Sequence, residues 1–255
     1  MLNRTGIETA DFTWNLYTGC LNGCSFCYAR KLARGWLKDT YLRNENTSPL
    51  VPADVDRTDP FFPRFWRNRR DDPFTVPETF RSSNSLLRRG TVMIFAIDMG
   101  DIFGPSIPAD WIWELMGIIE RCPQVFQILT KFPGNLLYWA AAHGLPENVW
   151  AGVTVCNQSM VAPAVDCLSG IDAAVKYVCV EPFQEGIVIS LSGVEWMIIG
   201  VQTNPLVLPQ REWIETLLKE AEESDTKVFL KEILNWQEDT LNGLHMTGGV
   251  ICDEV

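Results

Sequence analysis

Short apolar runs recur along the chain and are separated by longer, more polar stretches. Each run is continuous and does not alternate with polar residues, which is typical of strands buried on both faces of a parallel sheet. The predicted strands are residues 12–19, 92–97, 125–129, 149–155, 177–180, 196–201 and 228–230.

Helical patterns lie between these runs. Residues 109–121 and 209–223 place apolar residues every three or four positions, as an amphipathic helix does, and residues 28–38 form a further expected helix. Because strands and helices alternate, the predicted fold class is α/β with a parallel sheet. We expect one domain over residues 1–255, built as a parallel β/α barrel of six or seven strands that is closed or nearly closed.

Residues 40–90 differ from this core and form a predicted insertion within it. Six prolines between residues 49 and 77 argue against long regular elements there. From residue 64 to residue 89, seven arginines accompany three acidic residues, a surplus of four positive charges, while the whole chain has a net charge of −11. This basic segment contains aromatic residues, so it predicts either contact with a nucleotide or nucleic acid, or arginines that pair with the acidic body.

Charge, hydropathy and cysteine content exclude several classes of protein. A net charge of −11 is not that of a uniformly basic nucleic-acid-binding protein. No apolar stretch reaches the roughly 18 residues of a membrane span, and the first eight residues contain no signal-peptide core. The eight cysteines do not form the dense pattern of a small secreted protein. We therefore expect a cytoplasmic protein with no membrane partner.

Three of the cysteines, Cys20, Cys24 and Cys27, lie within eight residues in a C-x3-C-x2-C pattern. Thiolates bind zinc and iron–sulfur clusters, and Gly23 allows the loop to curl so that three sulfurs converge. No second pair of cysteines or histidines supplies the usual fourth zinc ligand. The spacing favours a [4Fe–4S] cluster with one open iron; a zinc ion completed by a distant residue and three unrelated core cysteines are the alternatives. We expect the others to be small buried residues: Cys122, Cys156, Cys167, Cys179 and Cys252.

Polar residues follow the ends of most predicted strands, which is where β/α barrels build their sites. Polar strand ends are also expected simply because a strand must meet water. Lys131 and Glu181 are the strongest candidates, since each directly follows an apolar strand with a proline nearby. The strand-end residues are Cys20, Asp98, Asp101, Thr130, Lys131, Thr154, Asn157, Glu181, Gln202, Lys231 and Glu232.

The cysteine loop, with Phe26 directly before its third cysteine, resembles the signature of the radical S-adenosylmethionine (SAM) superfamily. Farther along, the chain is similar to a phage- and prophage-associated family of unknown function with a radical-SAM-like core. The similarity is collinear from about residue 13 to about residue 231, and it is weak over residues 40–90 and after about residue 235. Its segments are TWN at 13–15, MGDIF at 99–103, QILTK at 127–131, NVWAGVTV at 148–155, VEP at 180–182 and VFLK at 228–231.

The resemblance implies a radical SAM enzyme with a TIM-barrel-like core. The three loop cysteines would bind three irons of a [4Fe–4S] cluster, and SAM would bind the fourth iron through its amino and carboxylate groups. A reduced cluster would pass one electron to the sulfonium, giving methionine and a 5′-deoxyadenosyl radical that abstracts a substrate hydrogen. A flavodoxin- or ferredoxin-like protein would supply the electron.

The resemblance also implies which residues contact SAM. Phe26 would lie beside the adenine. Gly100 and Asp101 occupy the place of the superfamily's Gly-Gly-Glu segment, which binds the amino group; the aspartate is one methylene shorter than the glutamate. The remaining predicted SAM contacts are Tyr28, Thr154, Asn157 and Gly200. On the substrate side, for charge pairing or proton transfer, the candidates are Lys131, Glu181 and Lys231.

Three functions fit these observations. The first is a radical SAM enzyme acting on an unidentified substrate, with a nucleotide or nucleic acid near residues 64–89 as one class. The second is a nucleic-acid-binding module that uses zinc or a cluster only as a structural staple. The third is a degenerate enzyme that keeps its cluster for structure or electron transfer. Metal content and formation of 5′-deoxyadenosine from SAM distinguish the three.

Overall fold

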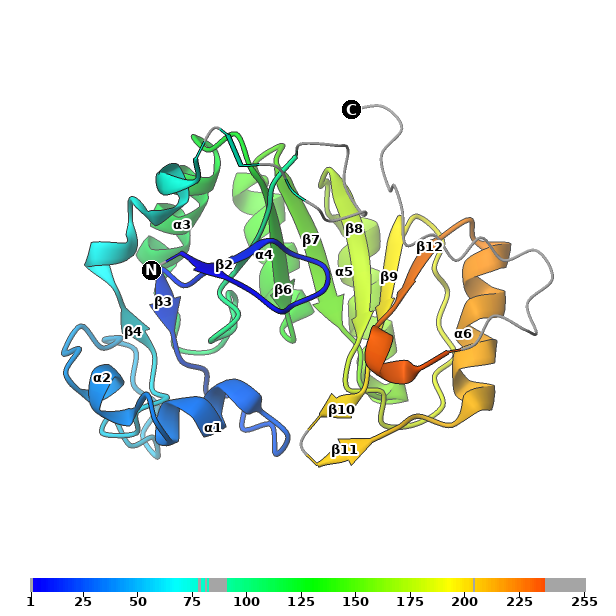
Figure 1. Cartoon of the computed structure of the whole chain (residues 1–255), viewed down its shortest axis with the longest axis horizontal. Coiled ribbons are helices and arrows are strands. Elements are labelled where there is room, and N and C mark those ends of the chain that lie inside the picture. Colours follow the sequence, from blue (N-terminus) through cyan, green and yellow to red (C-terminus); the bar gives the residue numbers. More distant parts are fainter. Residues whose placement is uncertain (1, 78, 81, 83–90, 204, 237–255) are drawn as a thin grey trace.

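The computed structural model describes residues 2–77, 79–80, 82, 91–203 and 205–236. Its main sheet has eight strands in the order β1-β2-β5-β6-β7-β8-β9-β12 (Figure 1). β1 is antiparallel to β2, and all other neighbours are parallel. The predicted α/β class is confirmed, and the sheet is mostly parallel, with eight strands where six or seven were expected. The bounds are Asn3–Arg4 for β1, Phe12–Trp14 for β2, Met93–Ala96 for β5, Val125–Thr130 for β6, Val149–Thr154 for β7, Val175–Val180 for β8, Trp196–Ile199 for β9 and Lys227–Leu230 for β12.

Four helices connect parallel strands of this sheet. They are α3 (Ala109–Ile119) after β5, α4 (Pro133–His143) after β6, α5 (Val161–Gly170) after β7 and α6 (Arg211–Glu223) after β9. In Figure 1 the helices lie outside the curved sheet, and the N-terminal segment crosses its open side. The apolar residues of the helices pack with those of the strands in one main core, which is why the strands read as continuous apolar runs.

Smaller elements lie outside the main sheet, and α1 and α2 are near each other in Figure 1. Two short helices follow the cysteine loop: α1 (Tyr28–Arg34) and α2 (Lys38–Leu42). Two further pairs of strands are β3 (Tyr17–Thr18) with β4 (Arg64–Phe65), and β10 (Gln202–Thr203) with β11 (Leu206–Val207). The 3-10 helices are η1 (Arg67–Arg69), η2 (Asp72–Thr75), η3 (Gln158–Met160) and η4 (Glu232–Leu234).

The segment predicted as one strand over residues 12–19 belongs to two sheets. β2 ends at Trp14, and β3 leaves the main sheet to pair with β4 of the predicted insertion. The side chain of Asn15 stabilises this change of direction. Its Nδ2 donates to Asp98 Oδ1 at 2.5 Å, and its Oδ1 accepts from the Met99 N–H at 2.9 Å. A polar residue buried between two apolar segments is therefore the reason why the strand is interrupted.

Three differences concern helices, and one is that no helix was predicted where α5 lies. The helix predicted over residues 28–38 is divided, because α1 is capped by Gly35 and α2 begins three residues later. No sequence pattern predicts α4, because its central residues are apolar or small on every side and give no clear stripe. Tyr138 is 77% exposed although the neighbouring Trp139 is buried, so hydropathy alone does not distinguish the two faces.

The inner face of the sheet carries a second, smaller apolar cluster. Along β9, Trp196 and Ile198 belong to this cluster, whereas the alternate residues point to the main core. Tyr177 lies in the same cluster, over Gly152 of β7, and its hydroxyl donates to the Ile128 carbonyl oxygen at 2.7 Å. Bulky residues thus fill the inner face, and polar residues follow toward the carboxyl ends of the strands.

Two expectations from composition concern cysteines and membranes. The predicted burial of Cys122, Cys156, Cys167 and Cys179 is confirmed, and Cys252 lies outside the described residues. Within the described ranges, the structure contains no helix with the length and apolarity that crossing a membrane requires.

The contact between Gly152 and Tyr177 leads to a stability prediction. A Cβ at residue 152 would lie 2.1 Å from the tyrosine ring, which is fully buried and hydrogen-bonded. We therefore expect Gly152→Ala to lower the free energy of unfolding by about 1–3 kcal/mol through overpacking. The measurement is urea denaturation followed by circular dichroism.

Gly117→Ala is the matched control. Gly117 lies inside α3, and nothing is within 4 Å of the Cβ that the substitution adds. Because alanine favours the helix over glycine, this variant is expected to be unchanged or stabilised by up to about 1 kcal/mol. Equal effects of the two substitutions would contradict the packing explanation.

Candidate functional site

A cavity of about 430 Å³ lies between the inner face of the sheet, the cysteine loop and the N-terminal segment. Ten of the thirteen predicted site residues line it, and they come from segments distant in the sequence. These ten are Cys24, Phe26, Cys27, Tyr28, Gly100, Asp101, Lys131, Thr154, Glu181 and Lys231. The structure therefore brings most of the sequence-predicted residues to one place.

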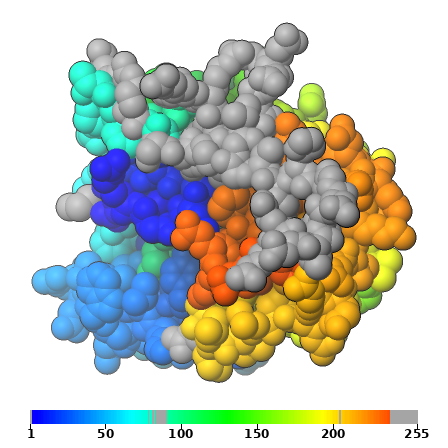
Figure 2. Space-filling view, turned by 45° about the vertical axis from the view of Figure 1, so that its right-hand side comes forward, coloured from blue at the N-terminus to red at the C-terminus, as the bar shows by residue number. Residues whose placement is uncertain are grey.

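The N-terminal segment connects regions near opposite edges of the sheet. Figure 2 shows this dark blue segment beside the orange segment that follows β12. Glu8 Oε2 accepts a hydrogen bond from the Glu232 N–H at 2.9 Å, and Thr9 Oγ1 donates to Gln127 Oε1 at 3.2 Å. Thr9 and Gln127 both line the cavity, so this segment forms part of its wall.

The cysteine loop begins at a very close contact between backbones. Gly19 has φ +98°, and a Cβ there would lie 2.7 Å from the backbone oxygens of Phe61 and Phe62. On its other side Gly19 donates from its N–H to the Met99 carbonyl oxygen at 2.9 Å. A Cβ on Gly100 would lie 2.9 Å from the Gly19 carbonyl oxygen. Gly100 is therefore needed for this approach, whatever it contributes to a ligand.

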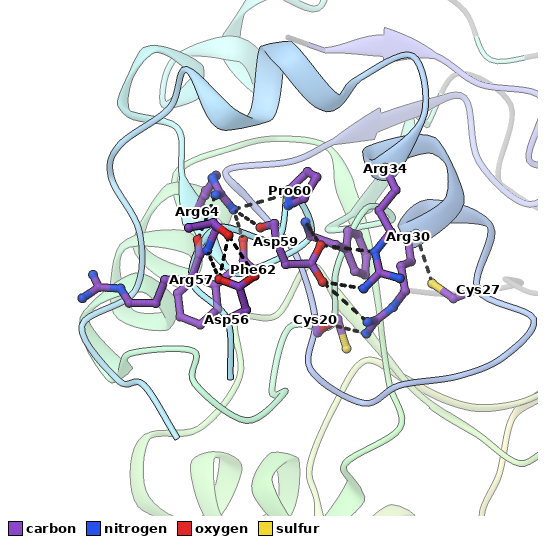
Figure 3. Close-up of polar contacts among 12 residues, drawn as sticks. Cys20, Cys27, Arg30, Arg34, Asp56, Arg57, Asp59, Pro60, Phe62 and Arg64 are labelled. Carbon is purple, nitrogen blue, oxygen red and sulfur yellow. Dashed lines mark hydrogen bonds and ion pairs between the residues drawn. The ribbon is translucent and has the colours of Figure 1, made fainter. Parts of the chain in front are cut away.

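Arg30 attaches the loop to the insertion (Figure 3). Its Nη2 donates to the Cys20 carbonyl oxygen at 2.9 Å, and its backbone N–H donates to Cys27 Sγ at 3.3 Å. Asp59 of the insertion pairs with Arg34 at 2.6 Å and lies 4.0 Å from Arg30. Partial burial alone would raise the pKa of Asp59. Arg34 and the Phe61 N–H outweigh this effect, so the pKa of Asp59 lies below its usual range. The insertion thus supports the loop through charge-assisted contacts.

Most of the described arginines between residues 64 and 89 are engaged within the chain. Arg64 is buried and donates to the carbonyl oxygens of Phe62, Asp59, Pro60 and Arg57 at 2.7–3.3 Å, as Figure 3 shows.

Two more arginines of this segment have partners in the body of the chain. Arg69 donates to the Asn15 carbonyl oxygen at 3.1 Å and stacks on Trp66, and Arg70 pairs with Glu114. For Arg64, Arg69 and Arg70 the intramolecular interpretation is therefore supported. Arg81, Arg88 and Arg89 lie outside the described residues. Contact with a nucleic acid stays a prediction.

Each sulfur of the loop accepts an N–H. Asn22 donates from its backbone to Cys20 at 3.4 Å and from its side chain to Cys24 at 3.1 Å, and Arg30 donates to Cys27. Burial, and then the charge of Asp101, raises the pKa of Cys20 to about 12. In the part of the chain that the structure describes, no three His, Cys, Asp or Glu side chains are grouped to hold one metal ion.

Asp101 is a buried carboxylate with three donors from its own chain. Its Oδ1 accepts from Thr130 Oγ1 at 2.6 Å and from the Phe103 N–H at 3.1 Å, and its Oδ2 accepts from the Lys131 N–H at 2.9 Å. Burial outweighs these bonds and raises its pKa. Asp101 therefore joins the end of β5 to the end of β6, which is a positioning role beyond the predicted SAM contact.

Asp98 is a second carboxylate of the cavity, and the predicted SAM contacts do not include it. Asn15 donates to its carboxylate, and the Tyr28 hydroxyl donates to its carbonyl oxygen at 2.8 Å. Burial raises the pKa of Asp98. The position of Asp98 directly after an apolar strand is the sequence signal that indicates a site residue. The preceding Ile97 has φ +63°, an unfavourable conformation for a β-branched residue that re-aims the chain at this strand end.

Glu181 and Lys231 form an ion pair at one side of the cavity. The Lys231 ammonium lies 2.7 Å from Oε1 and 2.5 Å from Oε2 of Glu181. Burial alone would lower the pKa of Lys231, but the glutamate outweighs it and the pKa is raised. Gly200 belongs to this pair: a Cβ there would lie 2.7–2.9 Å from the Glu181 side chain. Gly200 is outside the cavity lining and makes room for the carboxylate.

Two other predicted residues do not line the cavity. Cys20 packs against an apolar cluster formed by α1 and the predicted insertion, and Asn157 precedes η3, where its Oδ1 accepts from Ser159 at 2.7 Å. Conversely, Gln127, Tyr177 and Cys179 line the cavity without having been predicted. Alternation along a strand could have indicated such residues. Cys179 lies two positions before Glu181, and residues two positions apart lie on the same face of a strand.

Comparison with known proteins identifies the family. Residues 4–250 match the model of a family described as "Protein of unknown function (DUF5131)", and the chain therefore belongs to this family. No curated protein and no solved structure matches the chain.

The contrast between a buried and an exposed ion pair gives a testable prediction. The Glu181–Lys231 side chains are 25% and 17% exposed, whereas Lys219 and Glu223, which lie 3.7 Å apart on α6, are 76% and 62% exposed. In a double-mutant cycle with Glu181→Gln and Lys231→Met, we expect a coupling free energy above about 1 kcal/mol. The reason is that each single variant leaves a partly buried charge without its partner.

The same cycle on Lys219 and Glu223 is the control. Water screens this pair, so its coupling should stay below about 0.5 kcal/mol. Both cycles are measured by urea denaturation. A coupling at Glu181 and Lys231 no larger than that of the exposed pair would contradict the close contact.

Proposed function

We propose that this member of the DUF5131 family is a radical SAM enzyme. Cys20, Cys24 and Cys27 would hold a [4Fe–4S] cluster, and the adjoining cavity would take SAM and a substrate. The observation that carries the proposal is the position of the cysteine loop, whose Cys24 and Cys27 face a cavity lined by paired and unpaired charged side chains. The resemblance of the loop to the radical SAM signature supplies the chemistry.

The donor set of the loop fits such a cluster. Thiolates are the usual ligands of iron–sulfur clusters, and hydrogen bonds to the sulfurs tune their potential. All three sulfurs accept an N–H from within the loop or from α1. The three side chains are not grouped around one ion, and a cube of four irons needs no such grouping because it receives its three thiolates at separate corners.

The sheet supports a barrel-like interpretation. Parallel strands with helices outside place their carboxyl ends at one rim, where such enzymes build their sites. The contact between Glu8 and Glu232 joins segments near the two edges of the sheet at this rim. We therefore assign the chain a partial β/α barrel, with Asp59 and Phe61 of the predicted insertion packed beside the cysteine loop.

When held by Cys20, Cys24 and Cys27 and reduced, the cluster would supply the electron for cleavage of SAM and so the radical chemistry that removes a hydrogen from the substrate. The chain's own residues would bind and orient SAM and the substrate, and they would keep water out of the cavity. Phe26 lines the cavity where the adenosine would lie, and Tyr28 is fixed there by its bond to Asp98. Glu181 and Lys231 would hold or move a proton near the substrate.

The proposal includes a reducing partner and a cellular location. A flavodoxin- or ferredoxin-like protein would deliver the electron. All seven described cysteines are free thiols, which fits the reducing conditions of the cytoplasm.

Anaerobic reconstitution with iron and sulfide tests the function. We expect about four irons per chain and 5′-deoxyadenosine from SAM in the presence of dithionite. Cys24→Ala should abolish the product because it removes one cluster ligand, while circular dichroism should show an intact fold, since Cys24 is only partly buried. Iron analysis and chromatography of the nucleoside are the measurements.

Cys167→Ala is the control, because Cys167 is a buried cysteine of α5 outside the loop. It should keep iron and product. One zinc per chain instead of iron would favour a structural staple, and iron without 5′-deoxyadenosine would favour a degenerate enzyme. Either result, or full product from Cys24→Ala, would overturn the proposal.

A further inference from the structure

The charged side chains of the cavity differ in how well hydrogen bonds and ion pairs compensate their charges. Five of them line it: Asp98, Asp101, Lys131, Glu181 and Lys231. Asp98 accepts from Asn15, Asp101 accepts three hydrogen bonds from its own chain, and Glu181 pairs with Lys231. Four of the five therefore have strong partners, and Lys131 is the exception.

Lys131 has one weak polar contact at its ammonium group. Its Nζ donates to Thr154 Oγ1 at 3.4 Å, and it forms no ion pair with any residue that the structure describes. Asp101 is nearby, but its Oδ2 is bonded to the backbone N–H of Lys131 and not to the ammonium. A partly buried cation without a partner is costly, so its retention in a cavity points to a ligand.

The sulfur atoms of Cys156 and Cys179, two of the three cysteines near Lys131, do not provide the missing charge. Burial raises the pKa of Cys156 to about 11 and that of Cys179 to about 12. Both thiols are therefore neutral at pH 7. Of the other groups near Lys131, Cys24 belongs to the cysteine loop and Asp101 is bonded to other donors, so no described side chain forms an ion pair with the ammonium.

Thr154 completes the arrangement. Its hydroxyl oxygen accepts from Lys131, so its own hydrogen is available for a further acceptor. Both residues line the cavity, at the ends of the adjacent strands β6 and β7. An ammonium and a hydroxyl side by side make two donors for the oxygens of one anion.

We propose that Lys131 and Thr154 bind an oxyanion of the substrate, a carboxylate or a phosphate group. This rests on the proposed function, in which the carboxylate of SAM is bound by the open iron and does not need Lys131. The substrate class is therefore an anionic molecule, or a residue of a larger molecule that carries such a group. Lys231 has a different role, because Glu181 already neutralises it.

Thermal unfolding in the presence of simple oxyanions tests this site. The full-length protein, with and without reconstituted cluster, is heated in inorganic phosphate, in acetate and in chloride at equal ionic strength. A ligand that binds only the folded state raises the melting temperature. We expect phosphate or acetate to raise it relative to chloride in the wild type, and Lys131→Met to lose this shift.

Two variants keep the test specific. Lys131→Arg retains the charge and should retain the oxyanion shift, whereas Lys219→Met removes an exposed lysine of α6 and should leave the shift unchanged. Lys131→Met is expected to fold, because it removes a poorly compensated charge. Thermal unfolding in chloride checks this directly.

SAM binding to the cluster-loaded protein separates the two sources of an oxyanion. Equilibrium dialysis should give the same SAM affinity for the wild type and Lys131→Met. The inference is wrong if no oxyanion shifts the wild type, if the shift survives Lys131→Met, or if this variant loses SAM affinity. The oxyanion shift requires neither iron nor SAM cleavage, so its failure is distinguishable from failure of the proposed function.

Discussion

The candidate site depends on one steric constraint, the passage of Gly19 between two other backbone segments. The backbone oxygens of Phe61 and Phe62 occupy the space that a side chain at residue 19 would need, and Gly100 approaches from the opposite side. Because two glycines meet there, the chain can leave the sheet and begin the cysteine loop directly beside the end of β5. The position of all three sulfurs relative to the cavity follows from this contact, since the loop has no regular structure of its own before α1.

The second determinant is how the cavity distributes its charges. Buried carboxylates are tolerated here because each is bonded to a donor of the chain, and these bonds also fix the ends of neighbouring strands. Asp101 links β5 to β6, and Glu181 links β8 to β12 through Lys231. The acids thus stabilise the rim as well as lining the cavity, whereas the ammonium of Lys131 forms no ion pair with a described residue.

Much of the sheet could be predicted from the sequence, because strands buried on both faces read as apolar runs and the main core continues through all of them. The site could be predicted in outline because parallel strands end at one rim. What the sequence did not reveal are contacts between distant segments. Gly200 makes room for the Glu181 side chain, and Gly100 makes room for the Gly19 backbone. A glycine pattern does not distinguish close packing from ligand binding. The break after Trp14 was missed for a similar reason, since Asn15 finds its partners more than eighty residues later.

The described part of the predicted insertion supports the backbone of the cysteine loop. A loop that must present three sulfurs cannot pair its own backbone in a helix or a sheet, so other segments must satisfy it. Phe61 accepts from the Cys20 N–H at 3.1 Å, and Asp59 orients Arg30, which donates to the Cys20 carbonyl oxygen. The buried Arg64 in turn gathers the carbonyl oxygens of residues 57–62 and fixes the segment that makes these contacts. The aromatic and basic composition of the predicted insertion also suits a nucleic-acid contact. Its packing against the loop explains that composition in part.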